Sequence, residues 1–247
     1  MSQAMRMAEV KEAWNCLPVV TLERLLDGRV PLILAPHPDD ESLGCGGLLA
    51  QCAAAGIAAQ VAILTDGSRS HPGSRSHPPA RLAEVRRAEA ETALATLGLP
   101  VQALHWIAAE DTRLPHTGGA GEAILARLAA ICERTGCTLL LSPWGHDPHC
   151  DHEAAAGLAA RLAAQRGMPL LSYPVWGWTL PDDAERNVPL PVGMRLEITD
   201  QLSAKRCAIR AHATQYGEVI TDSPQGFTLP ETLLSVFRRR HETFLSA

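Results

Sequence analysis

One short segment of the chain places a histidine beside three acidic residues. It reads Pro36-His37-Pro38-Asp39-Asp40-Glu41 and follows an apolar run over residues 30–35. The run is short and branched, as is typical of a strand buried on both faces. His37 and Asp40 could bind one metal ion from a single turn, which would leave Asp39 free for proton transfer.

The same segment could instead be a solvated acidic loop in which Glu41 or Ser42 caps a helix. Two observations favour the metal site. Three carboxylates in one turn repel one another and lose hydration when no cation is near. A second cluster also follows a predicted strand, because residues 146–152 hold three histidines and two aspartates.

The two clusters are expected to meet, since ligands of open α/β sheets bind at the carboxyl ends of the strands. His37, Asp40 and one histidine of the second cluster would form a three-ligand site with an open position. Such a site is typical of hydrolytic zinc rather than structural zinc. His152 begins a predicted helix and is the expected third ligand, while His146 is expected at the surface or behind the ligands. A remaining histidine could stabilise an oxyanion.

Strand and helix patterns alternate four times along the chain, which is typical of a parallel, doubly wound sheet in the α/β class. The predicted strands cover 30–35, 57–64, 101–107, 138–142 and 169–173, and the predicted helices cover 42–55, 80–97, 121–134 and 153–165. No Gly-x-Gly-x-x-Gly follows the first strand, so a dinucleotide is not expected.

The remaining segments predict a helical lead-in before this alternation and a looser pattern after it. Residues 1–29 are expected to hold a helix around 15–24. The later segments predict an edge strand over 194–199 and helices over 201–215 and 230–244. No shift in composition marks a boundary, so residues 1–247 are expected to form a single domain.

The segment 68–79 contains a near-repeat of Ser-Arg-Ser-His-Pro. Its composition is typical of a mobile surface loop, but its position after a strand end predicts a substrate loop or lid. Arg69 or Arg75 could hold an anionic group there, and His71 is a further substrate-binding candidate. Trp144, Trp176 and Trp178 could stack on a sugar, with Trp144 the expected substrate contact, although tryptophans more often belong to a core or an oligomer surface.

Composition excludes several classes of function. The 247-residue chain is 46% apolar with a net charge of −5. It has no long basic block, which argues against nucleic acid as a partner, and Arg238-Arg239-Arg240 is expected on a solvated face. No apolar stretch is long enough to span a membrane, and no signal-peptide core is present. The dispersed cysteines predict reduced thiols in a cytoplasmic protein.

The chain resembles the LmbE-like, or PIG-L, N-acetyl-sugar deacetylases over about residues 30–245. The specific parts are the segment 36–41 and Asp147-Pro148-His149-Cys150-Asp151-His152, where Cys150 replaces the proline of many relatives. Softer parts are Thr65-Asp66-Gly67, Arg86-x-x-Glu89 with Leu97-Gly98, and Lys205 through His212-x-x-Gln215. The resemblance implies a Rossmann-like three-layer sandwich with a mostly parallel sheet. From their spacing alone, Arg86 and Glu89 could pair on the surface of helix 80–97.

The resemblance also implies roles for individual residues. His37, Asp40 and His152 would bind Zn²⁺, and Asp39 would be the general base and later the acid. His149 would polarise the carbonyl and stabilise the oxyanion. Asp151 would orient His149 or tune the site from behind the ligands.

The sequence therefore predicts a zinc-dependent hydrolase that removes an N-acetyl or other N-acyl group from an amino sugar or glycoconjugate. One alternative is an amidase that acts on a thiol conjugate or another non-sugar amide. Another is a sugar-binding relative that has lost turnover, although the presence of Asp39 and His149 argues against it. A homo-oligomer is left open.

Overall fold

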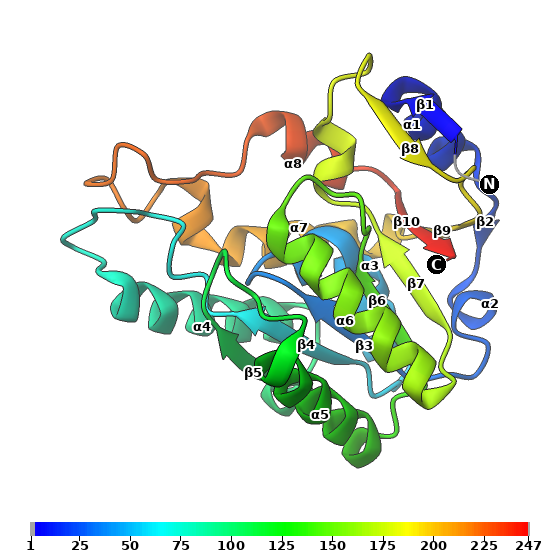
Figure 1. The fold of residues 1–247 in the computed structure, drawn as a ribbon, viewed down its shortest axis with the longest axis horizontal. Coiled ribbons are helices and arrows are strands. Elements are labelled where there is room, and N and C mark those ends of the chain that lie inside the picture. Colours follow the sequence, from blue (N-terminus) through cyan, green and yellow to red (C-terminus); the bar gives the residue numbers. More distant parts are fainter. Residues whose placement is uncertain (1–2, 247) are drawn as a thin grey trace.

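Within residues 3–246, the part of the chain that the computed structural model describes, a large central sheet organises the fold (Figure 1). Its strands are β2 (Val19–Val20), β3 (Pro31–Ala35), β4 (Gln60–Thr65), β5 (Leu104–Ala109), β6 (Leu139–Pro143), β7 (Leu170–Tyr173), β9 (Gly193–Glu197) and β10 (His241–Ser246). They lie in the order β2-β9-β10-β7-β6-β3-β4-β5.

The strands from β7 to β5 are parallel, as the alternation predicted. The chain enters this part of the sheet at β3, moves outward through β4 and β5, and then returns to form β6 on the other side of β3. The order therefore reverses between β3 and β6. Doubly wound sheets bind their ligands at the strand ends beside such a reversal.

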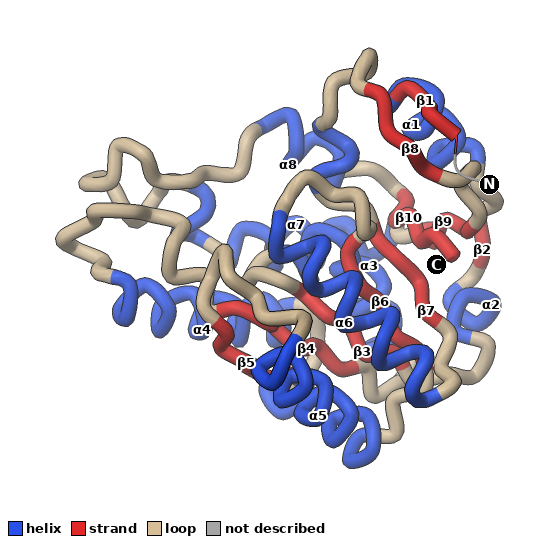
Figure 2. Tube along the Cα trace, viewed as in Figure 1, coloured by secondary structure: helices blue, strands red, loops and turns tan. Residues whose placement is uncertain are grey.

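Helices cover both faces of the sheet, and Figure 2 shows them around the strands. They are α1 (Met7–Cys16), α2 (Leu22–Leu26), α3 (Asp40–Ala54), α4 (Pro79–Thr96), α5 (Gly118–Thr135), α6 (Cys150–Arg166), α7 (Leu202–Ala211) and α8 (Glu231–Phe237). In no described helix do length and apolar character suffice for crossing a membrane.

Alternation along β3 explains the three layers. Ile33 and Ala35 join a core that includes residues of α3, α4, α7 and α8. Leu32 and Leu34 point to the opposite face and join a core with α5 and α6. Because both faces are buried, the strand reads as a continuous apolar run. The prediction of a three-layer α/β sandwich with a mostly parallel sheet is confirmed.

A small second sheet lies beside the central one, where β1 (Gln3–Arg6) pairs antiparallel with β8 (Glu185–Val188). Trp14 of α1 packs edge-on against Trp144 and Trp178 at this corner, with ring centroids 5.0 and 4.8 Å away. Short 3₁₀ segments complete the connections: η1 (Val101–Ala103), η2 (Trp176–Thr179), η3 (Thr199–Gln201) and η4 (Ala213–Tyr216).

The ends of the chain differ from the sequence prediction. The predicted helix 230–244 is wrong beyond Phe237, because residues 241–246 form β10, which pairs with β9 and β7. The predicted strand 194–199 is therefore an inner strand, since β2 pairs with its outer side. Near the N-terminus, the main helix covers 7–16 rather than 15–24, and residues 1–2 of the predicted lead-in lie outside the described part.

Candidate active site

The two histidine- and aspartate-rich clusters meet at the point where the strand order reverses. His37 lies just after β3, and His149 and His152 lie at the start of α6, which follows β6. Asp40 Oδ2 lies 3.2 Å from His37 Nδ1 and 3.3 Å from His152 Nε2. A nitrogen from each of the three imidazoles also lies within 4.8 Å of the other two.

This arrangement fits a divalent metal ion. Donor atoms that bind zinc tetrahedrally at 2.0–2.1 Å lie about 3.4 Å from one another. The two contacts to Asp40 Oδ2, at 3.2 and 3.3 Å, are close to that separation. His152 Nε2 is buried and makes no hydrogen bond to any residue between 3 and 246. An unpaired buried imidazole nitrogen is costly unless a ligand completes it.

Carboxylates behind the two imidazoles would select the tautomers that a metal ligand needs. Asp147 Oδ2 lies 3.0 Å from His152 Nδ1, and Asp151 Oδ2 lies 3.0 Å from His37 Nε2. In these tautomers His152 Nδ1 and His37 Nε2 carry the protons. The lone pairs of the other two ring nitrogens, His152 Nε2 and His37 Nδ1, then point toward Asp40. Such carboxylate–histidine contacts are common around metal ligands.

Asp147 has no role in the sequence prediction beyond its place in the motif. Its carboxylate also accepts the backbone N–H groups of Val175, Trp176 and Gly177 at 2.7–3.1 Å. The single side chain thus joins the start of α6 to the segment after β7. The pattern of the motif gave no sign of these partners, which come from a distant loop.

Asp151 contacts a different histidine from the predicted one. Its carboxylate faces His37 and accepts the N–H groups of Thr112 and Leu114 at 2.7 and 3.0 Å. The His149 ring accepts the backbone N–H of Asp151, which lies 3.2 Å from His149 Nδ1. Of the two roles that the resemblance implied for Asp151, these contacts favour tuning the site from behind His37 over orienting His149.

Asp111 is a further acid of the site that the sequence prediction missed. Its Oδ1 lies 3.4 Å from His37 Nε2, and its other oxygen accepts the backbone N–H of Arg69 at 2.9 Å. It follows the end of β5, so its position after a parallel strand is the signal that could have identified it.

Asp39 lies beside these ligands in a strained conformation. Its φ of 135° is rare for a residue with a side chain, and its carboxylate lies 3.3 Å from Arg86 Nη2. Arg86 is buried and donates to the carbonyls of Pro38 and Gly67 at 2.6 and 3.1 Å. Strain of this kind is often found at functional sites, where surrounding contacts must maintain it.

The predicted surface pair of Arg86 and Glu89 is wrong. Both side chains point inward from α4 and are buried. Glu89 accepts the backbone N–H and the hydroxyl of Thr214 at 2.8 and 2.7 Å. Their spacing on one helix face suggested a solvent-exposed pair, but that face is covered by the chain after α7.

Burial changes the proton affinities of two groups in this cluster. It raises the pKa of Asp39 to about 7, with the Asp40 charge adding to the rise and Arg86 opposing it. Burial also lowers the pKa of His149 to about 4, helped by the neighbouring His37 and His152. At neutral pH, Asp39 can therefore exchange a proton and His149 is uncharged.

His37, Asp39 and Asp40 open onto a pocket of about 430 Å³. Its wall includes Trp176 and Phe227, whose rings meet edge to face with centroids 5.7 Å apart. Arg69 also lines the pocket, and its guanidinium pairs with Glu110. Further lining residues are His37, Asp39, Asp40, Leu43, Ser70, Pro72, Arg86, Asp111, Thr112, Pro148, His149, Gln215, Gln225 and Leu229.

Part of this wall comes from two loops that project together at the left of Figure 1. They are the loop 68–79 and the loop 221–229. The carboxylate of Asp222 accepts the hydroxyls of Ser74 and Ser76 at 2.7 and 2.9 Å, and also two backbone N–H groups at 2.9 Å. The repeated serines of the loop are therefore its anchors.

Two of the predicted substrate-binding residues lie outside the pocket lining. Trp144 is buried against Trp14 at the corner beside the small sheet. His71 is buried next to Gly226, under the paired loops. His146 is exposed, in line with the prediction of a surface position. Sequence alone could not distinguish Trp144 from Trp176, since both follow strand ends.

Together, the fold and these residues define an α/β protein with a candidate metal site at the reversal point of a doubly wound sheet. The chain belongs to the PIG-L family, because the family described as GlcNAc-PI de-N-acetylase matches residues 32–163, more than half of its length.

Several characterised relatives are deacetylases. The chain is 28% identical over 197 residues to the diacetylchitobiose deacetylase of Thermococcus kodakarensis, covering 78% of this chain and 72% of that protein. It is 31% identical over 162 residues to the 2'-N-acetylparomamine deacetylase of Streptomyces fradiae, covering 61% of this chain and 57% of that one. The structure of the N,N'-diacetylchitobiose deacetylase from Pyrococcus horikoshii has the same fold, with a TM-score of 0.63, 20% identity, and coverage of 95% and 88%.

Proposed function

We propose that this protein is a metal-dependent hydrolase that removes the N-acetyl group from an amino sugar or glycoconjugate and releases acetate and a free amine. The observation that carries the proposal is the position of Asp40 Oδ2, which lies 3.2 and 3.3 Å from nitrogens of His37 and His152. Asp39 and His149 lie beside these ligands in one pocket. Membership of the PIG-L family and the deacetylase relatives support it.

Zinc is the metal that we propose for this site. Two imidazole nitrogens and one carboxylate oxygen suit zinc, and His37, Asp40 and His152 would hold it. When bound, zinc would supply a Lewis acid that polarises an acyl oxygen and makes water more acidic. Asp147 and Asp151 would hold the two imidazoles in their ligand tautomers.

Asp39 is the proposed general base and, later, the general acid. Its carboxylate lines the pocket, and burial raises its pKa to about 7. A group with this pKa can take a proton from the attacking water and return it to the leaving amine nitrogen. Arg86 holds the carboxylate in place from behind.

His149 is the proposed hydrogen-bond donor to the acyl oxygen. Its Nδ1 accepts the backbone N–H of Asp151, so in the neutral ring the proton lies on Nε2. The lowered pKa of His149 keeps the ring neutral. A fixed N–H beside the metal ligands would stabilise the negative charge that develops on the acyl oxygen.

The sugar would contact the wall formed by Trp176 and Phe227. Aromatic side chains offer a flat apolar surface with little conformational freedom, which suits the apolar face of a sugar ring. We therefore propose Trp176 and Phe227 as substrate contacts in place of Trp144 and His71. Arg69 remains a candidate contact at the same wall.

The test is acetate release from a panel of acylated amines, with the metal content of the purified protein measured in parallel. We expect zinc at about one ion per chain, turnover of N-acetylated amino sugars, and loss of activity on chelation that added zinc restores. Turnover confined to non-sugar amides or thiol conjugates would support the amidase alternative. Sugar binding without acetate release across the panel would support the silent relative.

We also propose that residues 1–247 act as one deacetylase domain in the cytoplasm. All seven cysteines are free thiols, and four of them are buried. Unpaired cysteines in this number suit a reducing compartment.

A further inference from the structure

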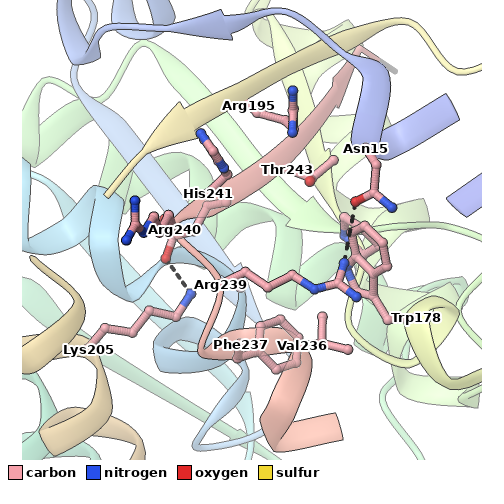
Figure 3. A pocket seen from close by; sticks show the side chains of 13 residues that line it. Asn15, Trp178, Arg195, Lys205, Val236, Phe237, Arg239, Arg240, His241 and Thr243 are labelled. Atoms are coloured by element: carbon pink, nitrogen blue, oxygen red, sulfur yellow. Dashed lines mark hydrogen bonds and ion pairs between the residues drawn. The ribbon is translucent and has the colours of Figure 1, made fainter. Parts of the chain in front are cut away.

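A second pocket, of about 380 Å³, lies where β9, β10 and η2 come together (Figure 3). It shares no lining residue with the pocket of the candidate active site. Its wall carries an unusual share of basic side chains. The lining residues are Asn15, Gly44, Pro174, Trp178, Arg195, Lys205, Val236, Phe237, Arg239, Arg240, His241, Glu242 and Thr243.

Three arginines of this pocket have no acidic partner among residues 3–246. Arg195 donates from Nε to the carbonyl of Leu17 at 2.8 Å, which leaves both terminal nitrogens of its guanidinium available. The Arg239 side chain makes one hydrogen bond within the described residues, to the amide oxygen of Asn15 at 3.4 Å. Arg240 makes no side-chain hydrogen bond or ion pair within the same described residues. The whole chain has a net charge of −5, so this local excess of positive charge does not reflect its average surface.

Glu242, the one carboxylate in the lining, cannot neutralise the three arginines. Glu242 accepts the buried Lys205 Nζ at 2.6 Å and the backbone N–H groups of Gly47 and Leu48 at 2.6 and 2.8 Å. Its charge is therefore matched by Lys205, and both of its oxygens are engaged. His241 is likewise paired, with Glu197 at 2.9 Å.

Beside these cations lie the aromatic rings of Trp178 and Phe237, each with a positive charge over its face. The guanidinium of Arg239 stacks over the ring of Trp178, 4.9 Å from the centroid. Figure 3 shows Arg239 extended across the pocket toward Trp178 and Asn15, with Phe237 and Val236 below it. In the same view Arg195 lies above Arg239, and Arg240 lies at the left, away from Trp178, with His241 between the two arginines.

We propose that this pocket binds a small organic phosphate. The phosphate would contact Arg240, and the apolar or planar body would extend along the pocket toward Arg239, where that side chain stacks over Trp178. Guanidinium groups bind phosphate through paired N–H donors, and several uncompensated positive charges favour a doubly charged anion. The volume is also within the range of small-molecule sites. This site is independent of the proposed deacetylase activity.

Calorimetric titration with adenosine monophosphate and with inorganic phosphate tests the proposal. Adenosine monophosphate should bind more tightly than phosphate, because it adds a planar group, and both should bind more weakly as salt rises. Arg240→Ala should weaken binding by about tenfold or more, since one charged contact is lost. Arg240 is exposed and without partners in the described chain, so its loss should leave the fold intact. Arg206→Ala, an exposed arginine of α7 outside the pocket, is the matched control.

Thermal unfolding gives a second readout. Adenosine monophosphate should raise the Tm of the wild type and of Arg206→Ala, and raise it much less in Arg240→Ala, because a ligand stabilises only the state that binds it. Absence of binding to the wild type at millimolar ligand would overturn the proposal. Equal losses in Arg206→Ala and Arg240→Ala would also overturn it. Dissociation of an oligomer in Arg240→Ala, measured by light scattering, would overturn it as well, because this face would then be a contact between chains.

Discussion

Two acids adjacent in the sequence acquire opposite proton affinities in this site. Burial raises the pKa of Asp39 to about 7. Burial also opposes ionisation of Asp40, but contacts with His152 and His37 outweigh it, and the pKa of Asp40 lies well below its usual range. Neighbouring carboxyl groups whose surroundings separate their pKa values can take separate roles. Asp40 therefore suits a metal ligand, and Asp39 suits proton transfer.

Replacing Asp39 with asparagine tests this division of roles. The amide has nearly the same shape but cannot accept the proton, so we expect a loss of kcat of about a hundredfold or more with zinc content unchanged. Acetate release and metal analysis measure the two effects. Asp183→Asn, at an exposed position, is the control. Near-normal turnover in Asp39→Asn would remove Asp39 from the role of base.

Asp147→Asn should weaken metal binding by about ten- to a hundredfold, because His152 loses the carboxylate that fixes its tautomer. Competition with a chelator of known affinity measures the change. Thermal unfolding of the zinc-free variant measures separately how much stability is lost when the hydrogen bonds from the Val175 and Gly177 N–H groups are weakened. Unchanged zinc affinity would contradict the role given to Asp147.

At the scale of elements, parallel strands place the reactive residues, and loops shape what reaches them. β3 and β6 end side by side, which brings the starts of α3 and α6 together. The pocket wall depends on the loop 68–79, which has no regular secondary structure of its own and is held by the loop 221–229. Rigid strands therefore support the candidate metal site, whereas side-chain contacts support the substrate wall.

Asp222→Ala should release the loop 68–79. We expect KM for the sugar to rise several-fold, proteolysis within the loop to become faster, and zinc content to stay unchanged. Hydrogen bonds from Ser74, Ser76 and the Arg75 backbone lower the pKa of Asp222 below its usual range. This stabilisation is complete above the ordinary carboxyl pKa of about 4 and is lost as pH falls through the lowered value. Unchanged KM and protease resistance at neutral pH would contradict this anchoring role.

At the scale of the whole molecule, one buried ion pair connects the C-terminal strand to the helical layer. Glu242 of β10 contacts Lys205 of α7 at 2.6 Å and two N–H groups of α3. Both side chains are almost completely buried. β10 is thereby fixed in an inner position of the sheet. A buried pair of this kind is costly to disrupt, although it adds little net stability.

Glu242→Gln should lower the free energy of unfolding by about 3 kcal/mol or more, because it leaves the Lys205 charge buried without a partner. The double variant Lys205→Met with Glu242→Gln should be less destabilised, since it buries no charge and keeps an oxygen that can accept an N–H group of α3. Urea unfolding of both variants measures the difference. A double variant less stable than Glu242→Gln would show that the pair itself contributes net stability.

Local patterns predicted the parallel core and the clusters but not the two ends of the chain. Residues 30–35 and 138–142 read as buried strands because both of their faces are covered. Residues 241–246 did not, since their partners β9 and β7 are set by tertiary packing rather than by their own pattern. The apolar spacing of α8 also ends at Phe237 without a glycine to mark its end.

By itself, the sequence determined which side chains can bind a metal and move a proton, and that they follow strands of one sheet. Ligand chemistry belongs to the side chains, and strand–helix order is a local property, so both are readable along the chain. Only the tertiary structure decided that Asp151 contacts His37, 114 residues away, and that Asp222 holds Ser74, 148 residues away. It also placed Trp176 rather than Trp144 in the pocket. Such contacts depend on how distant segments pack, and no local spacing encodes them.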